Sequence, residues 1–144
     1  MTTQRTLAII KPDAVTKGVV GQIITRIERA GLAIIAVKLV HMTLAEARGF
    51  YIVHRQRPFY ESLCAFMTQG PCLPMVLAGD DAIRKWRDLM GATDPVKAAA
   101  GTIRKDFAAS IEANAVHGSD APEAAAFEIP YFFSSFELWP RSTR

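Results

Sequence analysis

The spacing of hydrophobic residues changes along the first third of the chain, and each spacing predicts a different element. Residues 6–10 form a compact β-favouring run that stops at Lys11-Pro12, because proline cannot donate to a strand ladder. A helix follows, since its apolar residues recur at i, i+3, i+4 and i+7 before the helix-ending Gly31. These residues are Val20, Ile23, Ile24 and Ile27. Residues 32–40 are rich in valine and isoleucine and predict a buried second strand.

The middle of the chain predicts a helical hairpin. Thr43 and Glu46 have the spacing of a capping box, so a helix is expected to start here and to carry Tyr51 outward. Pro58 suits the first position of a second helix, on which Phe59, Leu63, Phe66 and Met67 share roughly one face. The hairpin is therefore expected between two strands.

The second half predicts two more strands and two more helices. Residues 72–78 form a strand despite Pro74, and Asp80 or Asp81 can cap a helix whose buried stripe is Ile83, Trp86 and Met90. The periodicity fades over residues 92–113, which predicts a long loop. A short strand ending at His117 and a helix from about Ala121 complete the pattern.

This order of elements is βαββαβ with insertions, which predicts a ferredoxin-like α+β fold with a mainly antiparallel four-stranded sheet. The insertions are the helical hairpin and the long loop before the last strand. The chain has 144 residues, enough for one domain covering residues 1–144 that buries about two thirds of its unfolded surface.

Composition narrows the function classes. Half of the residues are hydrophobic and 22% are charged, which is typical of a globular protein. The net charge of +3 suits a polyanionic ligand but is modest for a nucleic-acid binder. No secretory signal and no membrane-spanning stretch is visible, and Cys64 and Cys72 have no paired metal motif. We therefore expect reduced thiols, no membrane and a cytoplasmic location.

The stretch from Asn114 to Asp120 is the strongest candidate for chemistry, because a histidine there stands between a short strand and a glycine turn. His117 alone could be a structural imidazole. Ser119 and Asp120 lie too close in sequence for a hydrolase triad, whose members come from separate segments. The other segments supply basic, hydroxyl and aromatic side chains of the types that a nucleoside phosphate needs.

The stretch 114–120 matches the active-site signature of the nucleoside diphosphate kinases, and four further motifs resemble that family, mainly its bacterial members. They are residues 6–15 with Lys-Pro-Asp-Ala, residues 41–51, residues 87–94 with Arg-Asp-Leu-Met-Gly-Ala-Thr-Asp, and residues 101–106 with Gly-Thr-Ile-Arg. The resemblance spans essentially the whole chain. It implies that His117 takes the γ-phosphoryl group of a nucleoside triphosphate, mainly ATP, as a pros-phosphohistidine. It then passes the group to a nucleoside diphosphate in a ping-pong cycle.

The resemblance also implies a role for each further site residue. Glu128 and Ser119 orient the imidazole, and Tyr51 lies near the transferring phosphate. The remaining residues bind the nucleotide: Lys11, Arg87 and Arg104 contact phosphates or the ribose, Thr93 contacts a phosphate, Asn114 bonds to the 3′-hydroxyl, Phe59 stacks on the base, and Ile111 and Leu63 line the apolar wall. Stacking tolerates every base, which implies broad nucleotide use.

The expected partners follow from the same resemblance. Mg²⁺ is expected to arrive on the nucleotide phosphates, because the sequence has no clustered carboxylates for a metal site of its own. A homo-oligomer, either tetramer or hexamer, is expected, with no obligatory nucleic acid. Two rival classes are open from the residues alone: a phosphorelay carrier that passes the phosphoryl group to a protein, and a non-catalytic nucleic-acid binder, suggested only by the pI of about 9.1.

Overall fold

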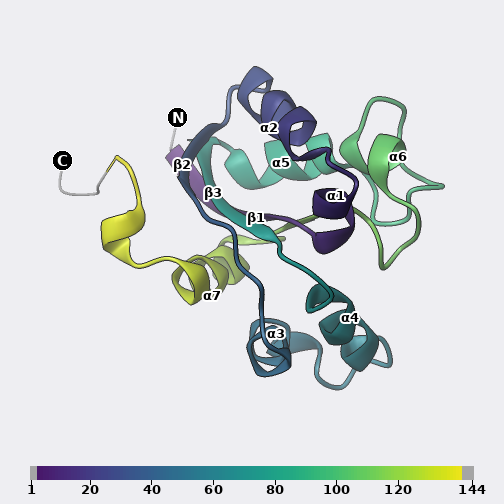
Figure 1. Cartoon of the computed structure of the whole chain (residues 1–144). Coiled ribbons are helices and arrows are strands. Elements are labelled where there is room, and N and C mark those ends of the chain that lie inside the picture. Colours follow the sequence, from purple (N-terminus) through teal and green to yellow (C-terminus); the bar gives the residue numbers. More distant parts are fainter. Residues whose placement is uncertain (1–2, 141–144) are drawn as a thin grey trace.

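Four antiparallel strands form the centre of the computed structural model, which describes residues 3–140 (Figure 1). The strands are β1 (Thr3–Ile10), β2 (Ala33–Val37), β3 (Leu73–Asp80) and β4 (Val116–Gly118). Their order in the sheet is β2-β3-β1-β4, so β4 lies at an edge beside β1. The predicted ferredoxin-like α+β fold with its four-stranded antiparallel sheet is confirmed.

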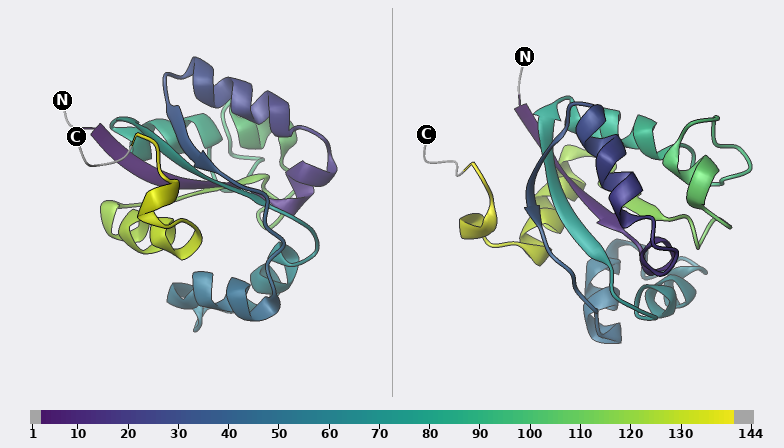
Figure 2. Two further views of the ribbon diagram at one scale, coloured as in Figure 1. Left: turned by 60° about the vertical axis from the view of Figure 1, so that its left-hand side comes forward. Right: turned by 45° about the horizontal axis from the view of Figure 1, so that its top comes forward.

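Helices cover both faces of this sheet (Figure 2). On one face lie α1 (Pro12–Thr16), α2 (Val20–Arg29) and α5 (Ala82–Met90). On the other lie α7 (Pro122–Phe132) and the helical hairpin of α3 (Leu44–Phe50) and α4 (Tyr60–Met67). The short α6 (Ile103–Phe107) packs beside α5, and the single-turn helices η1 (Ile52–His54) and η2 (Ser135–Glu137) follow α3 and α7. Within residues 3–140, no helix is long and apolar enough to cross a membrane.

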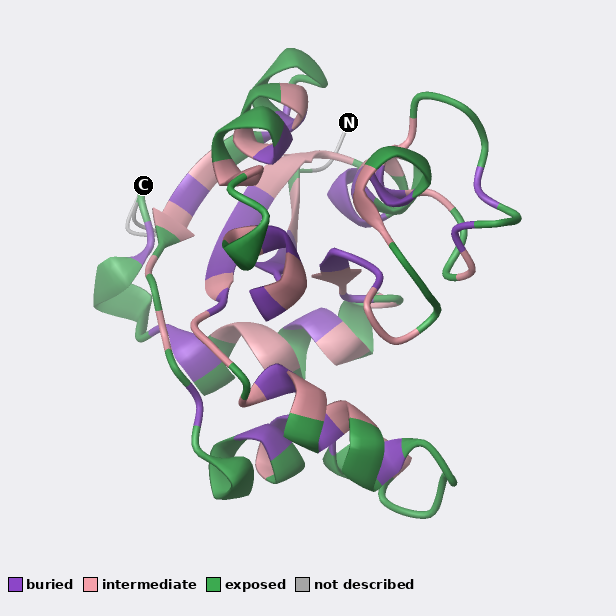
Figure 3. Ribbon diagram, turned by 45° about the vertical axis from the view of Figure 1, so that its right-hand side comes forward, coloured by how far each residue is buried: buried purple, intermediate pink, exposed green. Residues whose placement is uncertain are grey.

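Strand β1 explains why the core has two halves. Its residues Leu7 to Ile10 are fully buried, and successive side chains in a strand point to opposite faces. Leu7 and Ile9 pack with α3, α4 and α7, whereas Ala8 and Ile10 pack with α2 and α5. Figure 3 shows the buried segments along the strands and on the helix surfaces that face them. Each fully buried leucine or isoleucine contributes about 1.5–3 kcal/mol, so β1 is a rigid base for whatever lies at its ends.

The hairpin forms where the capping box predicts it, but two expectations about it are wrong. Thr43 and Glu46 do form the capping box. Tyr51 does not point outward: α3 ends at Phe50, the chain turns, and the Tyr51 side chain is only 4% exposed. The second helix begins at Tyr60, with Phe59 at its N-cap, so Pro58 lies in the preceding turn and not at the first helical position.

Two boundary predictions also change. Residues 92–113 are not wholly loop, because Thr102 caps the short α6 by accepting a hydrogen bond from the Lys105 N–H. Neither Asp80 nor Asp81 caps α5 with its side chain, since Asp81 has a left-handed backbone (φ 54°). The N–H of Ile83, in the first turn of α5, donates instead to the Gln4 side chain on β1. The Thr102 cap uses local i, i+3 spacing, whereas the bond between Ile83 and Gln4 joins residues that are distant in the sequence.

The turn before β4 is held by hydrogen bonds to Lys11 and Asp13, which lie near the start of the sequence. Ala115 has φ 72°, a left-handed conformation that side chains with a Cβ rarely adopt. Its N–H donates to Oδ2 of Asp13 over 3.1 Å, and its carbonyl accepts from the Lys11 N–H over 2.8 Å. The structure around α1 therefore imposes this strained turn immediately before β4.

Candidate active site

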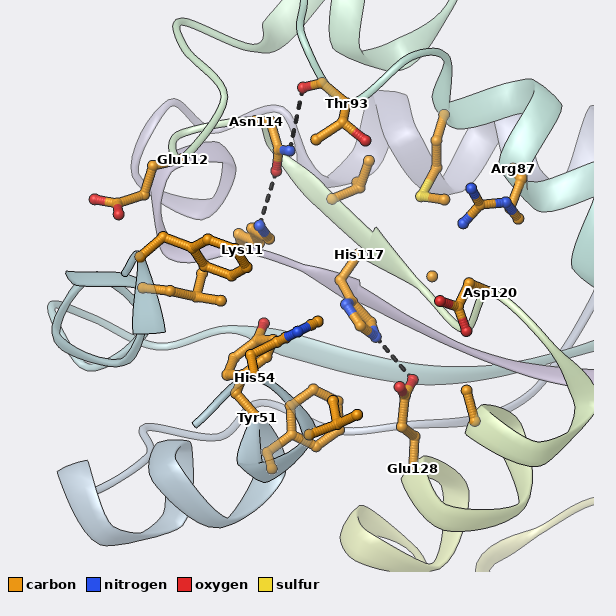
Figure 4. Close-up of a pocket in the computed structure, with 18 of the residues that line it drawn as sticks. Lys11, Tyr51, His54, Arg87, Thr93, Glu112, Asn114, His117, Asp120 and Glu128 are labelled. Atoms are coloured by element: carbon orange, nitrogen blue, oxygen red, sulfur yellow. Dashed lines mark hydrogen bonds and ion pairs between the residues drawn. The ribbon is translucent and has the colours of Figure 1, made fainter. Parts of the chain in front are cut away.

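His117 lies in a pocket of about 870 Å³ between the end of the sheet, the α3–α4 hairpin, α7 and the loop after α5 (Figure 4). It stands in the middle of β4, paired with Ile9 of β1. The expected position at the end of the strand is wrong by one residue, because Gly118 completes β4. The strand pairing places the imidazole beside Lys11, which follows the last residue of β1.

A carboxylate fixes the imidazole ring. Nε2 of His117 lies 2.8 Å from Oε1 of Glu128 on α7, and the same oxygen accepts a hydrogen bond from Oγ of Ser119 over 2.9 Å. Ser119 Oγ in turn accepts from the Leu7 N–H. A carboxylate accepts and does not donate, so the ring proton sits on Nε2 and Nδ1 keeps its lone pair. The arrangement leaves the lone pair of Nδ1 available to a ligand in the pocket.

Two aromatic rings enclose the imidazole. Phe50 and Tyr51 contact it edge-on, with ring centroids 5.3 and 6.1 Å from that of His117. The Tyr51 hydroxyl is buried without a hydrogen-bond partner among the described residues, and burial strongly raises its pKa. A neutral, unpaired hydroxyl of this kind can donate to an anion that enters the pocket.

Three cationic side chains line the pocket: Lys11, Arg87 and Arg104. None of them forms an ion pair within residues 3–140. Burial, and secondly the charge of Arg104, lower the pKa of the Lys11 ammonium to about 8. Burial and the charge of Arg87 lower the pKa of Arg104 to about 10. Like charges gathered without ion-pair partners cost energy unless an anion binds between them, so the site suits a polyphosphate.

Arg104 is also a structural clamp. Its guanidinium donates to three backbone carbonyls: Gly91 at 3.0 Å, Asn114 at 3.3 Å and Val116 at 2.9 Å. A guanidinium has five N–H donors, so two remain for a ligand. Arg87 differs, because it is exposed and forms no hydrogen bond with other residues of the range 3–140.

Asn114 connects two other site residues. Its Oδ1 accepts from the Lys11 ammonium over 2.8 Å, and its Nδ2 donates to the Thr93 carbonyl over 3.3 Å. Figure 4 shows these three residues on one wall of the pocket, across from Tyr51. The bond to Lys11 compensates part of the cost of burying that ammonium.

Apolar side chains form the mouth of the pocket. Phe59 and Leu63 come from the start of α4, and Ile111 comes from the loop before β4. Phe59 and Ile111 are 47% and 61% exposed, which is high for large apolar residues and leaves them free to contact a flat ligand. Ser62 donates to Glu112 over 2.6 Å and so joins the two walls.

The structure gathers the predicted site residues in one place. Every one of them lines the pocket except Ser119, which lies directly behind Glu128. Sequence reasoning did not identify the lining residues Phe50, His54, Glu112 and Asp120. The ring of His54 packs against Tyr51 and Phe59. His54 follows Tyr51 by three residues, and this helical spacing was a signal that the two side chains lie on the same side of the segment. Asp13, which holds Ala115, belongs to the Lys-Pro-Asp-Ala motif, but its bond to Ala115 was not predicted.

The chemistry of this arrangement defines a class of protein. A histidine with an oriented, free Nδ1 can form a covalent bond to phosphorus, and unpaired cations can bind the oxygens of a phosphate chain. The apolar mouth suits a nucleobase. The fold and the site together are those of a nucleotide-dependent phosphotransferase.

Comparisons with known proteins identify the family. The sequence model described as nucleoside diphosphate kinase matches residues 4–138. Curated nucleoside diphosphate kinases from Desulfosudis oleivorans and Nitrosospira multiformis are each 60% identical, covering 96% and 98% of this chain and 99% and 100% of the relatives. The chain belongs to the nucleoside diphosphate kinase family and has the activity for which the family is named.

Solved structures agree with this assignment. A nucleoside diphosphate kinase from Aquifex aeolicus has a TM-score of 0.93 at 43% identity, covering 95% of this chain and 99% of that one. A halophilic one from Halobacterium salinarum, in complex with CDP, has a TM-score of 0.91 at 41% identity, covering 98% of this chain and 95% of that one.

Proposed function

We propose that the chain moves the γ-phosphoryl group of a nucleoside triphosphate, mainly ATP, to nucleoside diphosphates through a pros-phosphohistidine at His117. The observation that carries this proposal is the bond between Nε2 of His117 and Glu128. That bond engages one ring nitrogen and leaves Nδ1, the pros nitrogen, to attack phosphorus.

The first half-reaction follows from this geometry. Nδ1 attacks the γ-phosphorus, the N–P bond forms, and the bond from that phosphorus to the β,γ-bridging oxygen breaks, so the nucleoside diphosphate leaves. Nε2 keeps its proton, and the positive charge that develops on the ring faces Glu128. In the second half-reaction, a terminal oxygen of another diphosphate attacks the same phosphorus, the new P–O bond forms, and the bond from phosphorus to Nδ1 breaks, which restores the neutral imidazole.

The remaining site residues bind the nucleotide in this proposal. Lys11, Arg87 and the two free N–H groups of Arg104 hold the phosphates, and the unpaired Tyr51 hydroxyl donates to the transferring group. Thr93 donates to a phosphate, and Asn114 bonds to the ribose 3′-hydroxyl.

The base lies between Phe59 and Leu63 on one side and Ile111 on the other in this proposal. No base-reading polar side chain is needed there, so any nucleobase is accepted.

Mg²⁺ is part of the substrate in this proposal, bound to the nucleotide phosphates. Residues 3–140 contain no group of three or more His, Cys, Asp or Glu side chains placed to hold a metal ion. The ion supplies charge neutralisation between the phosphates when the nucleotide binds. The protein's own cations then need to stabilise only the oxygens that the ion leaves free.

Label transfer tests the proposed function. The protein is incubated with γ-labelled ATP, freed of nucleotide, and given unlabelled GDP. Acid-labile label on the protein that then appears in GTP supports the proposal. Label that never reaches the protein contradicts it, and label that passes to a second protein but not to GDP would indicate a phosphorelay carrier.

The buried Lys11 predicts a pH dependence. Its pKa is lowered to about 8 in the free protein, and bound phosphates favour the charged form. Below pH 8, Lys11 is already protonated, so ADP affinity does not depend on its titration. Above pH 8, binding must take up a proton, and ADP affinity should fall roughly tenfold per pH unit. Titration calorimetry from pH 7 to pH 9.5 measures this slope.

Lys11→Met is the control for this slope. The variant cannot titrate at position 11, so its ADP affinity should be lower at pH 7 and should no longer fall through pH 8. A wild-type affinity that stays constant to pH 9.5 would show that Lys11 does not contact the phosphates.

We also propose that the chain forms a homo-oligomer, tetramer or hexamer. Strand β2 is an edge strand, and Val37 and Leu39 at its end are 50% and 63% exposed. An exposed apolar edge of this kind is commonly covered by a second chain. Sedimentation equilibrium gives the subunit number, and a monomer at micromolar concentration would contradict the proposal.

We propose a cytoplasmic location because the two cysteines do not form a disulfide. Cys64 and Cys72 are both free and buried, as expected where thiols are kept reduced. Cell fractionation tests the location.

A further inference from the structure

The side chain of Trp86 contacts the backbone of the proposed phosphoryl carrier. Trp86 lies on α5, is fully buried, and donates a hydrogen bond from its indole Nε1–H to the His117 carbonyl over 3.0 Å. Its place in the apolar stripe of α5 accounts for the burial of the ring. It does not account for the bond, since a phenylalanine would fill a core position without a polar atom.

Gly118 makes this contact possible. A Cβ atom at position 118 would lie 2.5 Å from Cδ1 and 2.7 Å from Nε1 of Trp86, and 2.7 Å from Cε of Met90. Contacts this short do not occur, so a side chain at 118 and the indole cannot both be present in this arrangement. The glycine of the signature is therefore required here for space, and the indole lies directly against the peptide that follows His117.

The bond matters because β4 has little support of its own. The strand has three residues, lies at the edge of the sheet and pairs with β1. Side-chain donors add to that support: Arg104 bonds to the Val116 carbonyl and Trp86 bonds to the His117 carbonyl. Glu128 orients the imidazole, but Trp86 holds the backbone from which the imidazole projects.

Trp86 also connects two parts of the pocket. The next residue on α5 is Arg87, whose side chain lines the pocket and lies across from His117 in Figure 4. The indole thus joins the helix that carries a proposed phosphate ligand to the backbone of the proposed nucleophile. In-line attack on phosphorus depends on this relative placement, because a displacement of about 1 Å can lower a rate by about 100-fold.

We propose that Trp86 is a positioning residue for phosphoryl transfer: its indole N–H holds the His117 backbone at the distance from α5 that in-line attack requires. This inference rests on the proposed role of His117 as the phosphoryl carrier. Trp86 does not line the pocket. It acts on the rate of transfer through the carbonyl that it binds.

The test removes the N–H and keeps the ring. The chain has two tryptophans, and Trp139 is 75% exposed and does not line the pocket, so Trp139→Phe provides a background with one tryptophan. Growth of this variant on benzothienylalanine places a sulfur atom where the indole has its N–H, with nearly the same shape. The Trp139→Phe protein with natural tryptophan is the matched control, and Trp86→Phe is a second, fully genetic variant.

Three quantities are measured on each protein: the single-turnover rate of phosphohistidine formation, the dissociation constant of ADP, and the carbonyl ¹³C shift of His117. The chain has three histidines, so labelling the histidine carbonyls gives a simple spectrum. The proposal expects a rate about tenfold lower without the N–H, ADP affinity within about twofold of the control, and an upfield shift of the His117 carbonyl as it loses a donor.

Two outcomes overturn the proposal. One is an unchanged phosphorylation rate in both altered proteins. The other is a loss of ADP affinity in parallel with the rate, which would make Trp86 an ordinary core residue whose loss disturbs the whole pocket. If the Trp139→Phe control itself forms no phosphohistidine, the proposed role of His117 fails first, and the positioning role fails with it.

Discussion

Replacing His117 with alanine should reduce phosphoryl transfer by on the order of 10⁶-fold, because loss of a nucleophile removes the covalent route entirely. His54 lines the same pocket but forms no hydrogen bond with a carboxylate within residues 3–140, whereas the Glu128 carboxylate bonds to Nε2 of His117. The variant should still bind ADP, since the proposed phosphate and base contacts stay in place. The measurement is the amount of acid-labile label on the protein after incubation with γ-labelled ATP.

His41→Ala is the matched control for this loss. His41 is exposed, bonds to the Thr68 carbonyl and lies outside the pocket. Its loss should leave both labelling and transfer to GDP unchanged. Acid-labile label on His117→Ala, equal to that on the wild type, would remove His117 from the mechanism.

Arg104→Gln should cost both stability and nucleotide binding. The guanidinium satisfies three backbone carbonyls, and the glutamine amide cannot span them. The Asn114 carbonyl keeps the Val116 N–H, but a buried carbonyl left without a donor costs about 1–3 kcal/mol, so the free energy of unfolding should fall by about 2 kcal/mol or more. Urea unfolding of the nucleotide-free protein measures this loss, and ADP titration measures the accompanying loss of affinity.

Arg87→Gln separates the two effects. Arg87 is exposed and forms no hydrogen bond with other residues in the range 3–140, so its loss should change the unfolding free energy by less than about 0.5 kcal/mol. ADP affinity should still fall, roughly tenfold, because a phosphate ligand is lost. Equal stability losses in the two variants would contradict the clamp that the structure assigns to Arg104.

The sequence predicted the capping box and the apolar stripe of a helix well, because both signals are local. The capping box of Thr43 and Glu46 depends on residues three apart, and the stripe of Ile23 and Ile27 depends on helical spacing, so both could be read directly. The fold class was predictable because the order of strands and helices along the chain is βαββαβ with insertions. The site residues came from ordered motifs along the whole chain, and the structure places them around one pocket.

Several of the errors concern residues whose environment is made by distant segments. Tyr51 was expected outside because its helix seemed to continue, yet the chain turns there and the ring packs beside His117. Arg104 could be recognised as a cation, but its three carbonyl partners come from two other segments. Trp86 looked like a core residue because helical spacing predicts burial and carries no information about hydrogen bonds across the fold.

The bonds that build the site also set when it can form. Leu7 bonds to Ser119, Lys11 to Asn114 and Asp13 to Ala115, and the partners are 112, 103 and 102 residues apart. Contacts this distant close the largest loops and form late in folding. On the ribosome, β1 is made early, and it can pair with β4 only after all the residues between them have emerged. A nascent or half-folded chain therefore cannot consume ATP, and the appearance of label on His117 would report the completion of folding.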